Sequence, residues 1–135
     1  MRTHYDAGQE RKVQRAAALS SAGRVVAGIV MFVLPETLPR GLGVDRGTAR
    51  RATPLTRFFA AREAALGAGA LYALRSGNDV RPWLVAQAVG DAGDAVALIA
   101  ATRARHVNAV RGAALALLAL SGVMGTTLAV RTLRR

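Results

Sequence analysis

Four long runs of apolar residues alternate with short polar or charged segments along this chain. The runs cover residues 16–34, 55–74, 82–101 and 112–130, and each is about as long as a helix that crosses a hydrocarbon core. The pattern predicts an all-α protein, an integral membrane bundle of four transmembrane helices in antiparallel, up-and-down order. At this length we expect a single domain over residues 1–135.

Prolines and turn-forming residues mark where the runs end. Pro35 and Pro39 stop the first run, because proline removes a backbone donor and clashes with the preceding turn. Residues 36–54 are rich in Gly, Pro and Arg and are expected to form a loop, and the charged segment before the first run is left outside its helix. The turn signal at residues 76–79 predicts that the second and third helices form a tight antiparallel hairpin. Pro82 suits the first turn of the third helix.

Composition supports close helix packing in a membrane. Apolar residues make up 52% of the chain, aromatic residues only 4%, and there are 14 glycines. Small residues at this density let helices approach closely, as they do in membranes. The net charge of +11 lies mostly in arginines between the apolar runs, so no nucleic acid is expected as a partner. A slight excess of Lys and Arg beside the termini and the second loop predicts a multi-pass protein of the cell membrane with both termini cytoplasmic.

A soluble, Ala-rich four-helix bundle is the alternative fold. It would explain the charged positions of the first three runs as solvent-facing residues. The fourth run carries no charge on any face and would have to be wholly buried, in a protein too small to surround it. This run therefore favours the membrane bundle.

Two carboxylates stand in the middle of the third apolar run. Asp91 and Asp94 are three residues apart, which places them on one face of a helix, and Gln87 extends the same face. A charge at this depth in a bilayer is costly and is usually retained for function or for a specific partner. These residues are therefore the first candidates for a functional site.

Other ionisable side chains lie at a similar depth. Arg24 is near the middle of the first run, Arg62 and Glu63 are near the middle of the second, and Ser121 is the midpoint of the fourth. We expect the charged groups to meet inside the bundle, where two arginines and three carboxylates would share one proton. Because neighbouring residues diverge by about 100° around a helix, Arg62 and Glu63 are expected to reach different helices rather than each other.

Such a cluster predicts acid–base chemistry on a lipophilic small molecule that enters from the bilayer, as in an isomerase, a cyclase or an epoxide-opening enzyme. The predicted catalytic residues are Asp91, Asp94 and Glu63, and the predicted ligand-binding residues are Arg24, Arg62, Gln87 and Ser121. The alternative is a non-catalytic membrane subunit or a small transporter in which the charges fix helix packing. A lined cavity beside the carboxylates would favour the first hypothesis, and a collapsed, fully paired network would favour the second.

No metal and no cofactor are expected. The Asp-x-x-Asp spacing is found in membrane prenyltransferases, which hold magnesium and diphosphate, but those enzymes use two such motifs and many more helices. Two nearby arginines also compete with a cation for the carboxylates. The expected partners are the lipid bilayer and a lipophilic small molecule, with a homo-oligomer left open.

Two resemblances accompany these patterns. The size and the four runs are similar to the small multidrug-resistance exporters, although the functional acid of that family lies in the first helix, where this chain has Arg24. The segment Ala60-Ala61-Arg62-Glu63-Ala64-Ala65-Leu66-Gly67, together with Asp91-Ala92-Gly93-Asp94, more closely resembles an uncharacterised family of small four-helix membrane proteins from GC-rich bacteria. That resemblance covers the chain from about residue 16 to its end. It implies the fold and supplies no activity.

Overall fold

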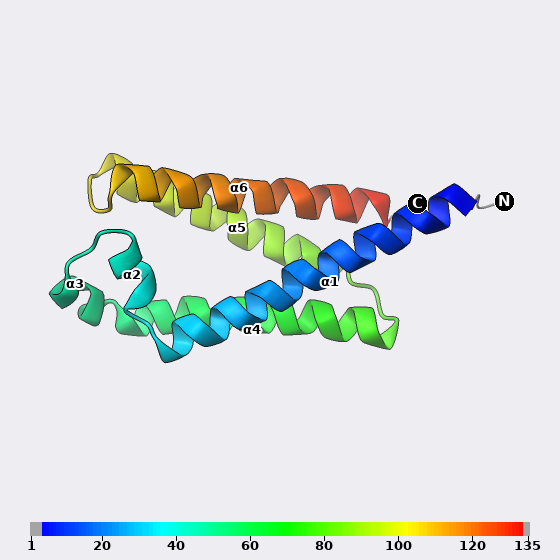
Figure 1. The fold of residues 1–135 in the computed structure, drawn as a ribbon, viewed down its shortest axis with the longest axis horizontal. Coiled ribbons are helices and arrows are strands. Elements are labelled where there is room, and N and C mark those ends of the chain that lie inside the picture. The colour runs from blue at the N-terminus through cyan, green and yellow to red at the C-terminus, as the bar shows by residue number, and fades with distance from the viewer. Residues whose placement is uncertain (1–3, 134–135) are drawn as a thin grey trace.

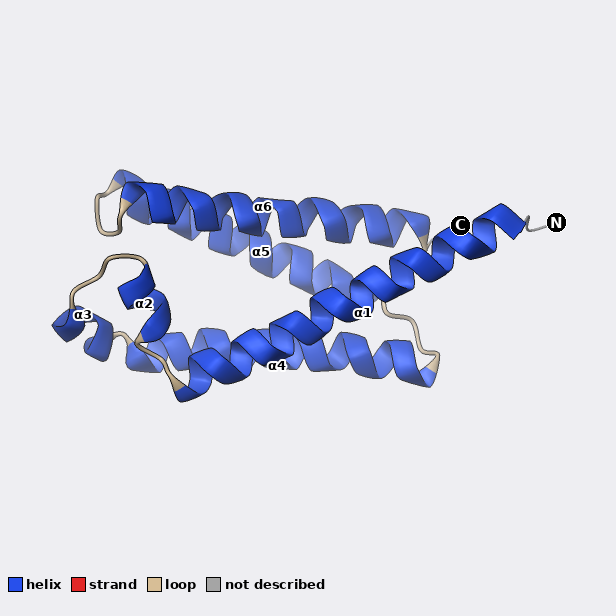
Figure 2. Cartoon of the chain, viewed as in Figure 1, coloured by secondary structure: helices blue, strands red, loops and turns tan. Residues whose placement is uncertain are grey.

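The computed structural model describes the backbone over residues 4–133 and the side chains over residues 8–133. The described chain is all-helical and contains no strand, so the predicted all-α class is confirmed (Figure 2). The helices are α1 (His4–Val33), α2 (Thr37–Gly41), α3 (Arg46–Arg51), α4 (Thr53–Ser76), α5 (Arg81–Arg103) and α6 (Ala109–Thr132).

The four long helices form two tightly packed pairs, α1 with α4 and α5 with α6 (Figure 1). Glycines allow the close approach within the first pair. A Cβ atom added at Gly67 would lie 2.5 Å from the carbonyl oxygen of Ser21, and one added at Gly28 would lie 2.6 Å from that of Ala60. Small residues therefore set the spacing of α1 and α4, as the glycine content predicted.

The connection from α4 to α5 is a short turn, but the predicted tight hairpin is wrong. Gly77 ends α4 with a φ of 70°, the Asn78 amide donates to a carbonyl of the last turn at 3.0 Å, and Pro82 lies in the first turn of α5. Beyond the turn, α4 and α5 make far fewer close backbone contacts than the two tight pairs. Long side chains fill the space between them, beginning with the Trp83 ring, which packs on Gly69.

The first helix is longer than predicted. It begins at His4 rather than at residue 16, although its first turns are strongly charged. The prediction considered only the apolar run. Gln9, Val13 and Ala17 recur every four residues and face the same interior space, so one stripe of α1 continues through the charged segment.

The segment 36–54 is not the loop that was predicted, because α2 and α3 form within it. Asp45 caps α3, accepting a hydrogen bond from the backbone amide of Thr48 at 3.0 Å. Pro39 is tolerated in α2 because the first amides of a helix have no partner within the helix. The Asn108 amide donates to the Leu42 carbonyl at 2.8 Å, which ties the end of α2 to the connection between α5 and α6.

An apolar cluster joins the two pairs at the other end of the molecule. Its buried members come from all four long helices and from the residue before α5, and they are Ala17, Ala70, Ala73, Val80, Leu84 and Val130. The short helix α2 lies at one end of the bundle (Figure 1), and this apolar cluster lies at the other end, near the turn between α4 and α5.

Three helices are long and apolar enough to cross a membrane, namely α1 from Gly8 to Val33, α5 and α6. α6 fits the bilayer best, since it exposes large apolar side chains such as Leu117, Leu118 and Met124. These helices indicate a membrane-embedded protein. α4 is not among them, because Arg57, Arg62 and Glu63 interrupt its apolar run.

Candidate functional site

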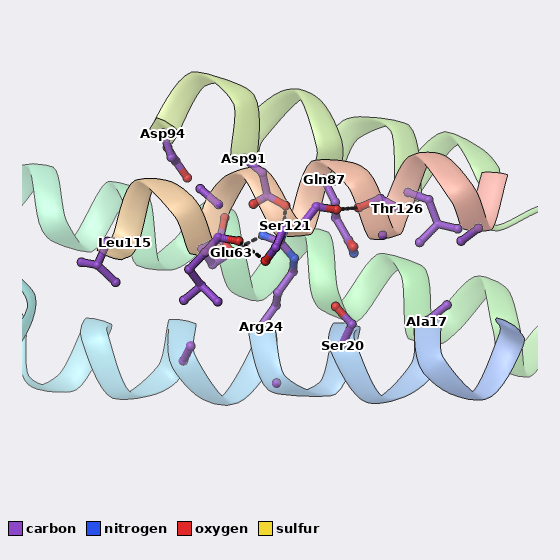
Figure 3. Close-up of a pocket in the computed structure, with 18 of the residues that line it drawn as sticks. Ala17, Ser20, Arg24, Glu63, Gln87, Asp91, Asp94, Leu115, Ser121 and Thr126 are labelled. Atoms are coloured by element: carbon purple, nitrogen blue, oxygen red, sulfur yellow. Dashed lines mark hydrogen bonds and ion pairs between the residues drawn. The ribbon is translucent and has the colours of Figure 1, made fainter. Parts of the chain in front are cut away.

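Arg24 joins three helices at the middle of the bundle. From α1 its Nη1 donates to Glu63 Oε2 on α4, and its Nη2 donates to Asp91 Oδ2 on α5 (Figure 3). Glu63 and Asp91 are only 6% and 7% exposed, so both carboxylates are buried within the bundle. Buried charges of this kind are tolerated when they are paired, and Arg24 pairs with both.

A second arginine extends this network to five charged side chains. Arg62 Nη2 donates to Asp94 Oδ2 at 2.6 Å and to Glu63 Oε1 at 3.2 Å. As predicted, the two neighbours reach different helices, Glu63 to α1 and Arg62 to α5. The expectation that they do not contact each other is wrong, since the long arginine side chain passes Glu63 on its way to α5. The predicted convergence is confirmed, and we call Asp91, Arg24, Glu63, Arg62 and Asp94, linked in that order, the charged cluster.

Gln87 lies on the same face of α5, one turn before Asp91, and is 2% exposed. Its Nε2 donates to Ser21 Oγ at 3.3 Å and to the Leu66 carbonyl at 3.2 Å. The amide thus ties α5 to α1 and to α4. Sequence reasoning missed Ser21, although its position three residues before Arg24 places it on the same face of α1.

Ser121 lies on α6 outside the charged cluster. Its hydroxyl donates to the Leu118 carbonyl of its own helix at 2.7 Å. The neighbouring Gly122, which the sequence analysis did not select, makes the close contact: a Cβ atom there would collide with Asp91 Oδ2. Gly125, which shares the small-residue spacing of Ser121, has no neighbour near its missing Cβ.

A cleft of about 1240 Å³ opens between α1 and α6, with α4 and α5 as its floor (Figure 3). Most of its lining is apolar and comes from Ala, Leu and Val side chains, with Leu38 and Leu42 of α2 at one end. Its polar lining includes Arg24, Glu63, Gln87, Asp91, Asp94 and Ser121. Six of the seven predicted site residues therefore share this cleft, and Arg62 is the exception.

The charged cluster leaves two carboxylate oxygens available for chemistry. Both oxygens of Glu63 are bound by arginines, whereas Asp91 and Asp94 each use only Oδ2. Among the described residues, none donates a hydrogen bond to the Oδ1 atom of either aspartate. Because both aspartates line the cleft, their Oδ1 atoms are the carboxylate oxygens of the charged cluster that remain for a ligand.

A metal site is not evident in the part of the chain that the structure describes. No group of three or more His, Cys, Asp or Glu residues there is arranged to hold a metal ion. The three carboxylates of the charged cluster are bound by arginines instead.

Comparison of the chain with protein-family profiles, with characterised proteins and with solved structures finds no match. The resemblance to small four-helix membrane proteins therefore stays a prediction. The function is therefore inferred from the cleft and the charged cluster.

Proposed function

We propose that this is an integral membrane protein whose cleft binds a lipophilic small molecule and acts on it by acid–base chemistry. The observation that carries the proposal is the cleft itself, which combines apolar walls with the charged cluster at its floor. A few convergent polar groups in a mostly apolar pocket are typical of small-molecule sites. The charged residues lie where ionisable groups within a membrane usually mark function.

In this proposal all four long helices cross the bilayer in antiparallel order. α4 carries Arg62 and Glu63 near its middle, but Glu63 is bound by Arg24 of its partner α1, and Arg62 by Asp94 of α5. Internal pairing of this kind lets a charged helix enter a membrane. An alkaline carbonate wash should leave the protein in the membrane pellet, and release as a monodisperse soluble protein would contradict the four-span arrangement.

The chemistry would be divided between the two aspartates. A protonated Asp91 or Asp94 would act as the general acid and the ionised one as the base, with Glu63 held by the arginines to keep the charge balanced. Arg24 would stabilise negative charge that develops on a substrate oxygen. An isomerase, a cyclase or an epoxide-opening enzyme needs this combination of one acid and one base.

A non-catalytic role is the second candidate, and one observation favours it. Each guanidinium group of the charged cluster binds two carboxylates, so the cluster ties together α1, α4 and α5 without any ligand. In a packing subunit or a small transporter this network would fix the register of the helices.

Asn substitutions at the aspartates distinguish the two candidates. Membrane lipids of cells that produce the wild-type protein, Asp91→Asn or Asp94→Asn should be extracted and compared by mass spectrometry. We expect a lipophilic compound to be converted with the wild-type protein and to persist with one or both variants. The control is Asp79→Asn, which alters an exposed carboxylate that pairs with Arg81 in the turn before α5.

All variants should first be shown to reach the membrane and to unfold cooperatively. If folded Asp91→Asn and Asp94→Asn proteins leave the lipid profile of the cells like that of the wild type, the acid–base role is wrong. The carboxylates would then serve helix packing.

A further inference from the structure

Near the charged cluster, the polar atoms that face the cleft are mostly hydrogen-bond acceptors, although the lining also holds the Gln9 amide and the Ser20 hydroxyl, which can donate. Gln87 uses the two protons of Nε2 for Ser21 and Leu66, which leaves its carbonyl oxygen Oε1. None of the described residues donates to this oxygen, although the side chain is 2% exposed and lines the cleft. Because this oxygen is not among the fully buried polar atoms, it is accessible to a ligand donor in the cleft.

Two hydroxyl groups of α6 also offer only acceptor atoms to a ligand, because their protons are already donated. Ser121 donates its proton to the Leu118 carbonyl and Thr126 donates its proton to the Gly122 carbonyl. Both residues line the cleft, so each hydroxyl oxygen has only lone pairs left for a ligand. The Oδ1 atoms of Asp91 and Asp94 add two further acceptors.

More acidic than basic side chains line the cleft. Glu63, Asp91 and Asp94 line it, while the only cationic side chain in the described lining is Arg24. Both terminal nitrogens of Arg24 already hold carboxylates. Arg62 does not line the cleft, and its guanidinium group lies over the Phe59 ring at 4.8 Å. A ligand therefore meets more negative than positive charge.

We propose that the cleft takes a lipophilic primary amine in its ammonium form. The inference rests on the proposed function, because it names the ligand class of the same cleft. The ammonium group takes the place of the proton that the proposed function puts on one aspartate, so all three carboxylates are ionised when the amine is bound and the ammonium group itself carries the acidic proton. Gln87 and Asp91 are one helical turn apart on one face, so an ammonium group between them can donate to Oε1 of the first and Oδ1 of the second. The alkyl chain would lie along the apolar walls of α1 and α6.

Three other head groups fit less well for separate reasons. A carboxylate is repelled by the aspartates. An alcohol carries no charge and has a single donor proton. A quaternary ammonium group has the charge but no N–H donor, so the acceptors of Gln87, Ser121 and Thr126 stay unsatisfied.

Equilibrium dialysis with four probes of equal chain length tests this assignment. The protein in phosphatidylcholine nanodiscs would be dialysed at pH 7 against dodecylamine, dodecyltrimethylammonium, dodecanol and laurate, with empty nanodiscs as the reference. We expect dodecylamine to bind about tenfold or more tightly than each of the others, since a hydrogen bond to a charged group is worth about 1.5–3 kcal/mol. Asp91→Asn should reduce this preference, whereas Asp79→Asn should leave it unchanged.

The possible failures are distinguishable. If none of the four probes binds above the level of empty nanodiscs, the cleft does not take a lipophile and the proposed function fails. If dodecyltrimethylammonium, dodecanol or laurate binds as well as dodecylamine, the cleft still binds lipophiles but the amine assignment is wrong. Equal preference in the wild type and in folded Asp91→Asn would also overturn the amine assignment, because the ammonium group would then not bind Asp91.

Discussion

At the scale of single residues, Arg24 is the centre of the charged cluster. It is the side chain that joins α1 to carboxylates on both α4 and α5. Its own side chain is 15% exposed, whereas that of Arg62 is 39% exposed. Removing Arg24 would leave the buried carboxylates of Glu63 and Asp91 without their main partner. Removing Arg62 would leave the carboxylate of Asp94 unpaired, but the Asp94 side chain is already partly exposed.

Arg24→Gln should therefore lower the free energy of unfolding by about 3–5 kcal/mol, the cost of breaking a buried ion pair on one side. Chemical denaturation in detergent micelles, followed by circular dichroism, would measure this loss. Arg57→Gln is the matched control, because Arg57 is exposed and donates only to the Phe32 carbonyl at the end of α1. A loss for Arg24→Gln no larger than that for Arg57→Gln would contradict the buried network.

Gly122 controls the position of Asp91 by lacking a side chain. In Gly122→Ala the new methyl group would collide with the Asp91 carboxylate and push it away from Arg24. We expect a loss of about 1–3 kcal/mol in the same denaturation experiment, as for other overpacked sites. Gly125→Ala, where nothing lies near the added methyl group, should be neutral or slightly stabilising. The same loss in both variants would mean that the contact with Asp91 does not matter.

The sequence predicted the residues of the charged cluster, but it did not predict the neighbouring residues Gly122 and Ser21 that position Asp91 and Gln87. Charges in apolar runs are conspicuous, and pairing at a common depth follows from their cost. The roles of Gly122 and Ser21 depend on what lies opposite them on another helix, and a single helix pattern does not contain that information. Arg62 met Glu63 because a long flexible side chain is not confined to the direction in which its Cβ points.

At the scale of elements, two tight helix pairs are joined by long side chains. Glycines bring α1 to α4 and α6 to α5, while Trp83, Gln87 and Arg62 span the wider gap between α4 and α5. The turn residues correctly predicted where α4 ends. They could not predict how far α4 and α5 stay apart, because that spacing depends on the size of the side chains between them.

The short helix α3 provides a pH-dependent element outside the long helices. Hydrogen bonds from Thr48 lower the pKa of the Asp45 carboxyl below its ordinary value of 3.8. Since the folded-state pKa is lowered, the cap is fully formed above pH 3.8 and is lost as the pH falls through the folded value.

Amide hydrogen exchange of Thr48, corrected for the intrinsic pH dependence, should accelerate as the pH is lowered below this range. Asp45→Asn keeps an acceptor without a titrating group, so it should remove the pH dependence while retaining much of the protection. Protection of Thr48 that is independent of pH in the wild type would show that the ionised carboxylate does not hold the start of α3.

At the scale of the whole molecule, the account depends on the space between the two helix pairs. The few close contacts between α1 and α6 leave the cleft open, with α2 tied across one end and the apolar cluster closing the other. No helix pattern predicts such a space. A lined cavity would favour a ligand site and a collapsed, fully paired network would favour a packing role; the structure has both a cleft and an extensively paired network.

Solid-state NMR of the isotope-labelled protein in lipid bilayers, with dodecylamine carrying a ¹³C-labelled chain, tests this account most directly. Ser20 of α1 and Gly125 of α6 both line the cleft. We predict cross-peaks from each of them to the labelled alkyl chain and a cross-peak between Arg24 and Asp91, with none that joins Ser20 directly to Gly125. A direct Ser20–Gly125 cross-peak without contacts to the alkyl chain would show that α1 packs on α6 in the bilayer, and the cleft would not be a binding site.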